Sequence, residues 1–107
     1  QNKNDYLNLK IYGWRISASN QIAEILKING STEINIHEIH ISKNGFIKLK
    51  EEDLNTVLIG SDQDKITTQL DYLIEIKRQL KKEEIYLNIE VLDLTDPINP
   101  EIKVFKP

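Results

Sequence analysis

The sequence predicts an α+β domain in which a mostly antiparallel or mixed sheet carries two helices packed on one face. Strand and helix patterns are segregated along the chain as strand, helix, three strands, helix and two strands, which is typical of that class. An Asn44-Gly45 pair between two apolar alternating runs is a strong hairpin signal. A chain of 107 residues, 39% of them hydrophobic, is also long enough to bury one core.

The first third of the chain predicts a short strand followed by a helix. Residues 6–13 alternate between apolar and polar side chains and end at a glycine. Ser17 or Ser19 can cap a helix over residues 19–29, which Gly30 then ends. The residues that recur on one face of this helix are Ile22, Ile25 and Leu26.

The middle of the chain predicts three strands. Residues 33–42 are rich in isoleucine, but their alternation changes phase near His37 and Glu38. A β-bulge at that point explains the change. Residues 46–49 follow the Asn-Gly turn as the second strand of a hairpin, and residues 56–59 form the third strand.

The longest predicted element is a helix that ends near Lys82. Ser61 is expected to cap it, with Asp62 and Asp64 in the first turn, where acidic side chains complement the helix dipole. Its apolar stripe consists of Ile66, Leu70, Leu73, Ile74, Lys77 and Leu80.

The last quarter of the chain predicts two strands. Residues 85–94 alternate with apolar side chains on both sides, which favours an interior strand. One side would hold Leu87, Ile89 and Val91, and the other Tyr86, Leu92 and Leu94. Asp96-Pro97 and Asn99-Pro100 turn the chain, and residues 102–105 form a short last strand.

Composition argues against several classes of protein. A net charge of −3 and a pI near 5.4 disfavour a nucleic-acid binder, which usually presents a basic face. The chain has no cysteine, and hence no disulfide, thiolate zinc site or cysteine nucleophile. No run reaches the roughly 18 apolar residues of a membrane span. Because the first residue is Gln1, we expect the chain to be part of a longer protein.

The residues that could carry catalysis form no recognisable site. His37 and His40 fall on opposite faces of a strand unless the bulge redirects one of them. Asp62 and Asp64 begin like a calcium loop, but the later ligand and glycine positions are wrong. Residues 51–53 are expected in a solvated loop. We therefore expect no catalytic residues, no metal, no cofactor and no small-molecule substrate.

Trp14 and the last strand are the remaining candidates for binding. Trp14 beside Arg15 could stack on a base or sugar, but a lone tryptophan more often anchors a helix in the core. Residues 102–106 follow two prolines at the end of the chain, so we expect them at a sheet margin, where an unpaired edge can accept another chain's strand. An ordinary terminal strand with a frayed end is the alternative.

Several short motifs occur in one order along the second half of the chain. Residues 57–60 read Val-Leu-Ile-Gly, and the amphipathic helix contains Gln-Leu-Asp-Tyr-Leu at residues 69–73. Leu-Asp-Leu at residues 92–94 is followed by Pro97, Pro100 and a short apolar strand. Together these motifs resemble the C-terminal half of FtsQ/DivIB cell-division proteins.

The upstream half extends this resemblance. Gly13-Trp14, the short first helix and the hairpin over residues 39–49 resemble the cyanobacterial branch, so the likeness covers residues 12–106. It implies that residues 12–107 are the distal β domain of the family and that residues 1–11 are a poorly defined N-terminal segment. A POTRA-like polypeptide-binding or transport module and a hydrolase using His37, His40 and Glu52 are the alternatives.

The resemblance also implies a function. Family members are single-pass proteins of the inner membrane whose anchor and POTRA module would lie outside this chain, with the distal domain on the periplasmic side. That domain is a non-catalytic scaffold that recruits FtsB-like and FtsL-like division proteins for septum formation, by strand addition at its last strand.

Residues can be assigned to this role by their position in the last two strands. The tyrosine or tryptophan of the family has its closest counterpart here in Phe105. The residues implied to bind the partner are Glu101, Ile102, Lys103, Val104, Phe105 and Lys106, with Tyr86 and Leu92 in support.

Overall fold

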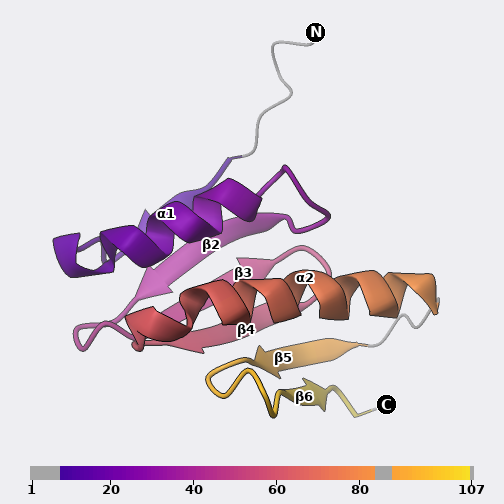
Figure 1. Cartoon of the computed structure of the whole chain (residues 1–107). Coiled ribbons are helices and arrows are strands. Elements are labelled where there is room, and N and C mark those ends of the chain that lie inside the picture. Colours follow the sequence, from indigo (N-terminus) through magenta and orange to yellow (C-terminus); the bar gives the residue numbers. More distant parts are fainter. Residues whose placement is uncertain (1–7, 84–87, 107) are drawn as a thin grey trace, which may run out of the picture.

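The computed structural model describes residues 8–83 and 88–106, which form one sheet with two helices on it (Figure 1). The order of strands and helices is the predicted one. The elements are β1 (Lys10–Tyr12), the 3-10 helix η1 (Ile16–Ala18), α1 (Ser19–Ile28), β2 (Ile36–Ile41), β3 (Ile47–Glu51), β4 (Asn55–Gly60), the 3-10 helix η2 (Gln63–Lys65), α2 (Ile66–Lys82), β5 (Ile89–Asp93) and β6 (Glu101–Val104).

The two helices lie on one face of a mixed sheet, as predicted. The six strands are arranged in chain order from β1 to β6. The pairs β1–β2 and β4–β5 are parallel, whereas the other neighbours are antiparallel. A parallel pair needs a crossover connection, and α1 and α2 supply the two crossovers.

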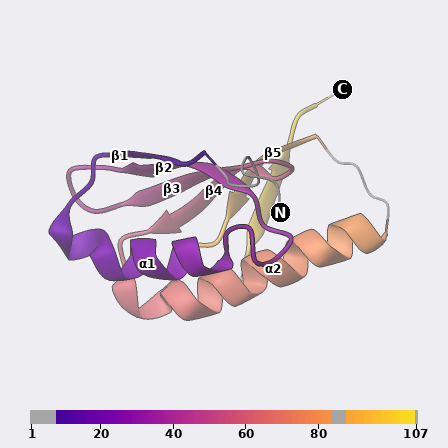
Figure 2. The same cartoon turned by 90° about the horizontal axis from the view of Figure 1, so that it is seen from above.

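The handedness of these crossovers explains why both helices share a face. Both connections step the same way along the sheet, and β1 and β4 point in the same direction. A right-handed connection then places α1 and α2 on the same side. Figure 2 shows both helices below the sheet, and no helix of the described residues covers the opposite, open face.

The hydrophobic core fills the space between the helices and the covered face of the sheet. It is aliphatic and rich in isoleucine, which suits β-branched packing on a pleated surface. The helices contribute Ile22, Ile25, Ile66, Leu70 and Leu73, and the strands contribute Ile36, Ile39, Ile41, Ile47, Leu49, Val57, Ile59, Ile89 and Leu92.

The predicted bulge in β2 is confirmed. The register with β3 shifts between Ile36 and Glu38, so that Ile36 and Ile39 are both buried although they are three positions apart, a spacing that puts residues of a regular strand on opposite faces. The bulge also places Glu38 and His40 on the open face, where they lie opposite lysines of β3. A phase slip in the sequence therefore marked a real irregularity of the strand.

A second bulge, in β5, was not predicted. The register with β6 shifts between Ile89 and Val91. As a result Ile89, Leu92 and Leu94 are all buried together, whereas simple alternation put Ile89 on the side opposite the other two. The interior position of β5 is confirmed, but its apolar residues gather mainly on the covered face.

The predicted helix caps are wrong in both cases. Neither Ser17 nor Ser19 is the N-cap residue of α1, because η1 precedes the helix. The N-cap positions of η1 and α1 are held by Arg15 and Ala18, and neither side chain forms a capping hydrogen bond. At the second helix Asp62, rather than Ser61, caps η2, with its Oδ1 accepting a hydrogen bond from the Asp64 N–H at 3.0 Å. A leading 3-10 turn shifts the cap position in each case.

Trp14 does not anchor a helix in the core, contrary to expectation. Its side chain is 57% exposed. The preceding Gly13 has a φ of +79°, and a Cβ there would lie 2.1 Å from the carbonyl oxygen of Ile41. This close backbone approach fixes the exit from β1, while smaller side chains, Ala18 and Ile22, fill the core beneath α1.

Candidate partner-binding edge

β6 forms one margin of the sheet, as predicted for the last strand. It pairs with β5 and is the final strand in the order of the sheet (Figure 1). Its registered pairs run from Asp93 opposite Glu101 to Ile89 opposite Val104. The far side of β6 has no neighbouring strand within the described part of the chain, so this side is a free edge.

Hydrogen bonds decide which backbone groups face this free edge. In a strand the N–H and C=O groups of successive residues point to alternate sides. The Phe105 N–H donates to the carbonyl oxygen of Asn88 at 2.8 Å and therefore points toward β5. By alternation, the backbone groups of Ile102 and Val104 point away from β5, toward the free edge.

The pairing of β5 with β4 leads to the same alternation. The Leu94 N–H donates to the Leu58 carbonyl oxygen of β4 at 2.9 Å. The neighbouring Asp93 must then direct its backbone groups toward β6, where Glu101 lies opposite. Two independent hydrogen bonds thus agree on the outward direction of Ile102 and Val104.

Apolar side chains line the same margin. Ile102 is 42% exposed, Val104 48% and Phe105 50%. Ile102 lies opposite Leu92, which is fully buried on the covered face. Figure 1 shows β6 beyond the strip of sheet that α2 covers, and this explains why Leu92 is buried and its neighbour Ile102 is not.

Two charged side chains of β6 lie on the open face. Glu101 is opposite Asp93, and Lys103 is opposite Val91. Neither Glu101 nor Lys103 forms an ion pair with a residue that the structure describes. The edge therefore combines free backbone groups, partly exposed aliphatic groups and two uncompensated charges of opposite sign.

The remaining residues predicted to bind or support the partner do not all lie in β6. Phe105 and Lys106 follow β6 and are exposed. Leu92 supports the edge from inside the core, as its register with Ile102 shows. Tyr86 lies outside the described residues.

The two histidines do not gather metal ligands around them. His40 lies on the open face, with its Nε2 2.7 Å from Glu38 Oε1 and its ring stacked on Tyr12 at a centroid distance of 4.7 Å. This hydrogen bond holds the pKa of the Glu38 carboxyl below its usual value. Within residues 8–83 and 88–106, no group of three or more His, Cys, Asp or Glu side chains could hold a metal ion.

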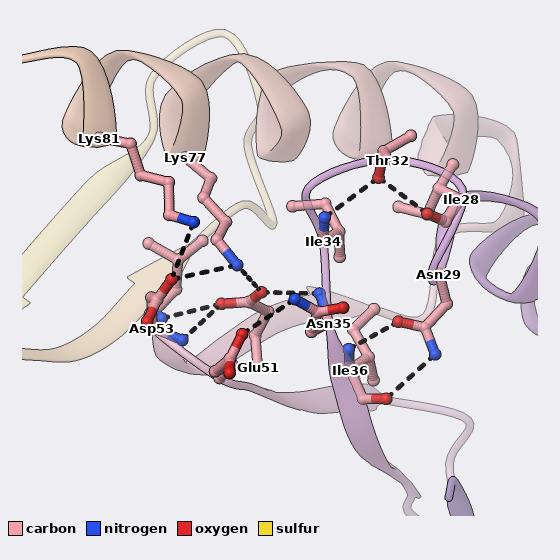
Figure 3. Close-up of polar contacts among 12 residues, drawn as sticks. Ile28, Asn29, Thr32, Ile34, Asn35, Ile36, Glu51, Asp53, Lys77 and Lys81 are labelled. Carbon is pink, nitrogen blue, oxygen red and sulfur yellow. Dashed lines mark hydrogen bonds and ion pairs between the residues drawn. The ribbon is translucent and has the colours of Figure 1, made fainter. Parts of the chain in front are cut away.

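Lys77 and Glu51 form a buried ion pair that was not predicted from the sequence. The prediction that Glu51 lies in a solvated loop is wrong, since its side chain is fully buried. Figure 3 shows Lys77 of α2 reaching down to Glu51 at the end of β3. Both side chains are buried, at 1% and 0% exposure. The signal was present in the sequence, since Lys77 falls on the apolar stripe of the helix.

Every oxygen of the Glu51 carboxylate has partners. Oε1 accepts hydrogen bonds from the N–H groups of Asp53 and Leu54 at 2.8 and 3.0 Å. Oε2 accepts one from the Asn35 N–H at 2.8 Å and one from Lys77 Nζ. A carboxylate saturated in this way is a structural clamp, and it is poorly suited to exchanging protons with a substrate.

The charge of Lys77 is stabilised by its neighbours. Burial alone lowers the pKa of this ammonium group, but the hydrogen bond and charge of Glu51 raise it, with help from Asp53 at 3.3 Å. The pKa of Lys77 is raised overall. Lys81 adds a longer contact to Asp53, at 3.8 Å.

No protein-family model and no curated protein matches the chain. Across the described residues, neither helix combines the length and the apolar character needed to cross a bilayer.

Proposed function

We propose that this chain is a non-catalytic binding domain that accepts a strand of a partner protein at β6. The observation that carries the proposal is the free edge, where the backbone groups of Ile102 and Val104 point away from the sheet. An added strand can satisfy these groups directly, and main-chain hydrogen bonds then supply affinity. The exposed side chains of Ile102, Val104 and Phe105 offer apolar contacts beside them.

The partner class follows from the resemblance to FtsQ/DivIB proteins. In this proposal the domain is a divisome scaffold on the periplasmic side of the inner membrane, held there by an anchor outside this chain. Its partners are FtsB-like and FtsL-like segments. Charge is consistent with a protein partner, since the net charge of −3 disfavours nucleic acid.

Amide hydrogen exchange tests the docking site directly. The exchange of the domain is measured with and without the periplasmic segments of the FtsB-like and FtsL-like proteins from the same organism. We expect new protection at Ile102 and Val104, whose N–H groups face the free edge, and little change at Phe105, whose N–H already bonds to Asn88. Binding that protects other segments instead would place the site elsewhere.

Two further outcomes address the alternatives. Absence of binding by calorimetry would contradict the proposed partners. Equal protection by unrelated unfolded peptides would favour a POTRA-like polypeptide-binding module over a dedicated division scaffold.

A further inference from the structure

The free edge of β6 is chemically suited to a second copy of itself. Exposed edges that carry apolar side chains pair readily with other edges unless something prevents it. A lysine in the strand is a common protection, and Lys103 occupies the middle of β6. Whether Lys103 prevents self-pairing depends on which residue lies opposite it in the paired copy.

Only a few registers are compatible with the backbone. Two copies that pair antiparallel must both offer outward N–H and C=O groups, which β6 presents at Ile102 and Val104. The two-fold axis of the pair can then lie between the two copies of Ile102, between the two copies of Lys103, or between the two copies of Val104. Each choice defines one register. All three arrangements place outward groups opposite outward groups. In the register of Ile102, Val104 lies opposite Pro100, which has a carbonyl group to accept a hydrogen bond but no N–H to donate one. The outward N–H of Val104 still has an acceptor there, so hydrogen bonding does not exclude that register.

Charge selects one of these registers. If the axis passes through Lys103, the two lysines face each other, which is unfavourable. If it passes through Val104, Lys103 faces Phe105. If it passes through Ile102, Glu101 of each copy faces Lys103 of the other, and two opposite-charge pairs form on the open face.

Glu101 has a further reason to favour this register. Within one copy it lies opposite Asp93, a charge of the same sign, and it has no ion pair with a described residue. Lys103 of a second copy would supply the missing positive charge. Ile102 would meet Ile102 on the other face, where both are now partly exposed.

We infer that two copies of this domain pair antiparallel through β6, in the register centred on Ile102. This inference rests on the proposed function, because it uses the same free edge. Self-pairing would regulate partner binding, since a partner strand and a second copy cannot occupy the edge together. An edge strand of 4 residues per copy makes a small contact. It falls below the roughly 1,000 Å² expected of stable complexes, so the dimer is weak and readily displaced.

Charge reversal tests both the dimer and its register. Sedimentation at increasing protein concentration is compared for the wild type, Glu101→Lys, Lys103→Glu and the double variant. Each single variant turns both attractive pairs into repulsive ones and should weaken association about tenfold or more. The double variant restores both pairs, so its association should return toward that of the wild type.

A mixture of the two single variants gives an additional test. One copy then carries two lysines and the other two glutamates, so each repels itself but attracts the other. We expect association in the mixture and not in either variant alone. In the register centred on Lys103, by contrast, the double variant would remain repulsive because two glutamates would meet.

The outcomes separate this inference from the proposed function. A wild type that stays monomeric at all concentrations, or single variants that associate as it does, would overturn the self-pairing. If that wild type still shows protection at Ile102 and Val104 with the partner segment, the proposed function stands. If self-pairing occurs, excess partner segment should dissociate the dimer, and coexistence of both complexes would contradict a shared edge.

Discussion

Lys77 and Glu51 form a buried ion pair that joins α2 to the end of β3. Glu51 also binds the backbone N–H groups of Asn35, Asp53 and Leu54, so one carboxylate connects the helix, the β3–β4 turn and the segment before β2. Such a pair costs desolvation energy when it forms, but it is costly to break from one side. It therefore acts mainly to fix the geometry of this end of the sheet.

Replacing Lys77 with Met should destabilise the fold strongly. The substitution keeps the length of the side chain but leaves Glu51 as a buried charge without its cation. We expect a loss of about 3–5 kcal/mol in the free energy of unfolding, measured by urea denaturation. The matched control is Lys81→Met, one turn later on the same helix and exposed, which should change stability by less than about 0.5 kcal/mol. Equal effects of both substitutions would show that the buried pair has no special role.

The same pair predicts a pH dependence on the alkaline side. The folded-state pKa of Lys77 is raised above its ordinary value of 10.5. Its contribution to stability is then fully present below 10.5 and is lost as the pH rises through the folded-state pKa. Above that pH the wild type should lose stability faster than Lys77→Met, and the gap between the two urea midpoints should narrow. If the urea midpoints of the two proteins changed in parallel with pH, Lys77 would not be the group responsible for the loss of stability.

Gly13 should tolerate no larger residue. An alanine Cβ would lie 2.1 Å from the Ile41 carbonyl oxygen, and φ is +79°. Gly45 has a similar φ of +84°, but its nearest neighbour to a Cβ is 3.9 Å away. Gly45→Ala should therefore cost about 1–2 kcal/mol from backbone strain alone. Gly13→Ala should cost clearly more in the same thermal unfolding experiment, because β1 must also move away from β2.

Gln69 should be the second polar residue on which the core depends. Its buried Nε2 donates to the carbonyl oxygens of Ile59 and Leu94, at 2.6 and 2.9 Å, and so joins α2 to β4 and to the residue after β5. Gln69→Leu leaves both carbonyl groups without this donor, and we expect a loss of about 2–4 kcal/mol in unfolding free energy. Gln79→Leu on the exposed face of α2 is the control and should be nearly neutral.

The sequence predicted the order of the elements because that order depends on local periodicity. The stripe of α2 and the Asn44-Gly45 turn are local signals, and both are confirmed. The bulge in β2 was also predictable, because the four isoleucines of residues 33–42 made the phase slip visible. The bulge in β5 was not, since Val91 is apolar and hides the slip at Glu90.

The buried polar residues were harder to predict, because their partners are far apart in the sequence. Lys77 was recognised on the apolar stripe, but nothing local indicates that Glu51, rather than Glu52, is its buried partner, or that Asp53 also contacts it. That choice depends on the β3–β4 register and the position of α2, which are tertiary properties. The position of β6 at a margin of the sheet was predicted from local features, the two prolines and the short apolar run that follows them.

The proposed docking edge makes a prediction in which two adjacent residues should behave differently. Val104→Pro removes an N–H that points toward the free edge, and proline is tolerated at such positions. The domain should stay folded, as judged by its thermal midpoint, while its affinity for the partner segment falls roughly tenfold. Lys103→Pro removes an N–H that points toward β5, so it should weaken the β5–β6 pairing and lower the thermal midpoint itself.

The control for the loss of the N–H is Val104→Thr, which keeps the N–H and the branched side chain. This variant should bind the partner segment nearly as well as the wild type. Wild-type affinity in a folded Val104→Pro variant would exclude strand addition at this edge.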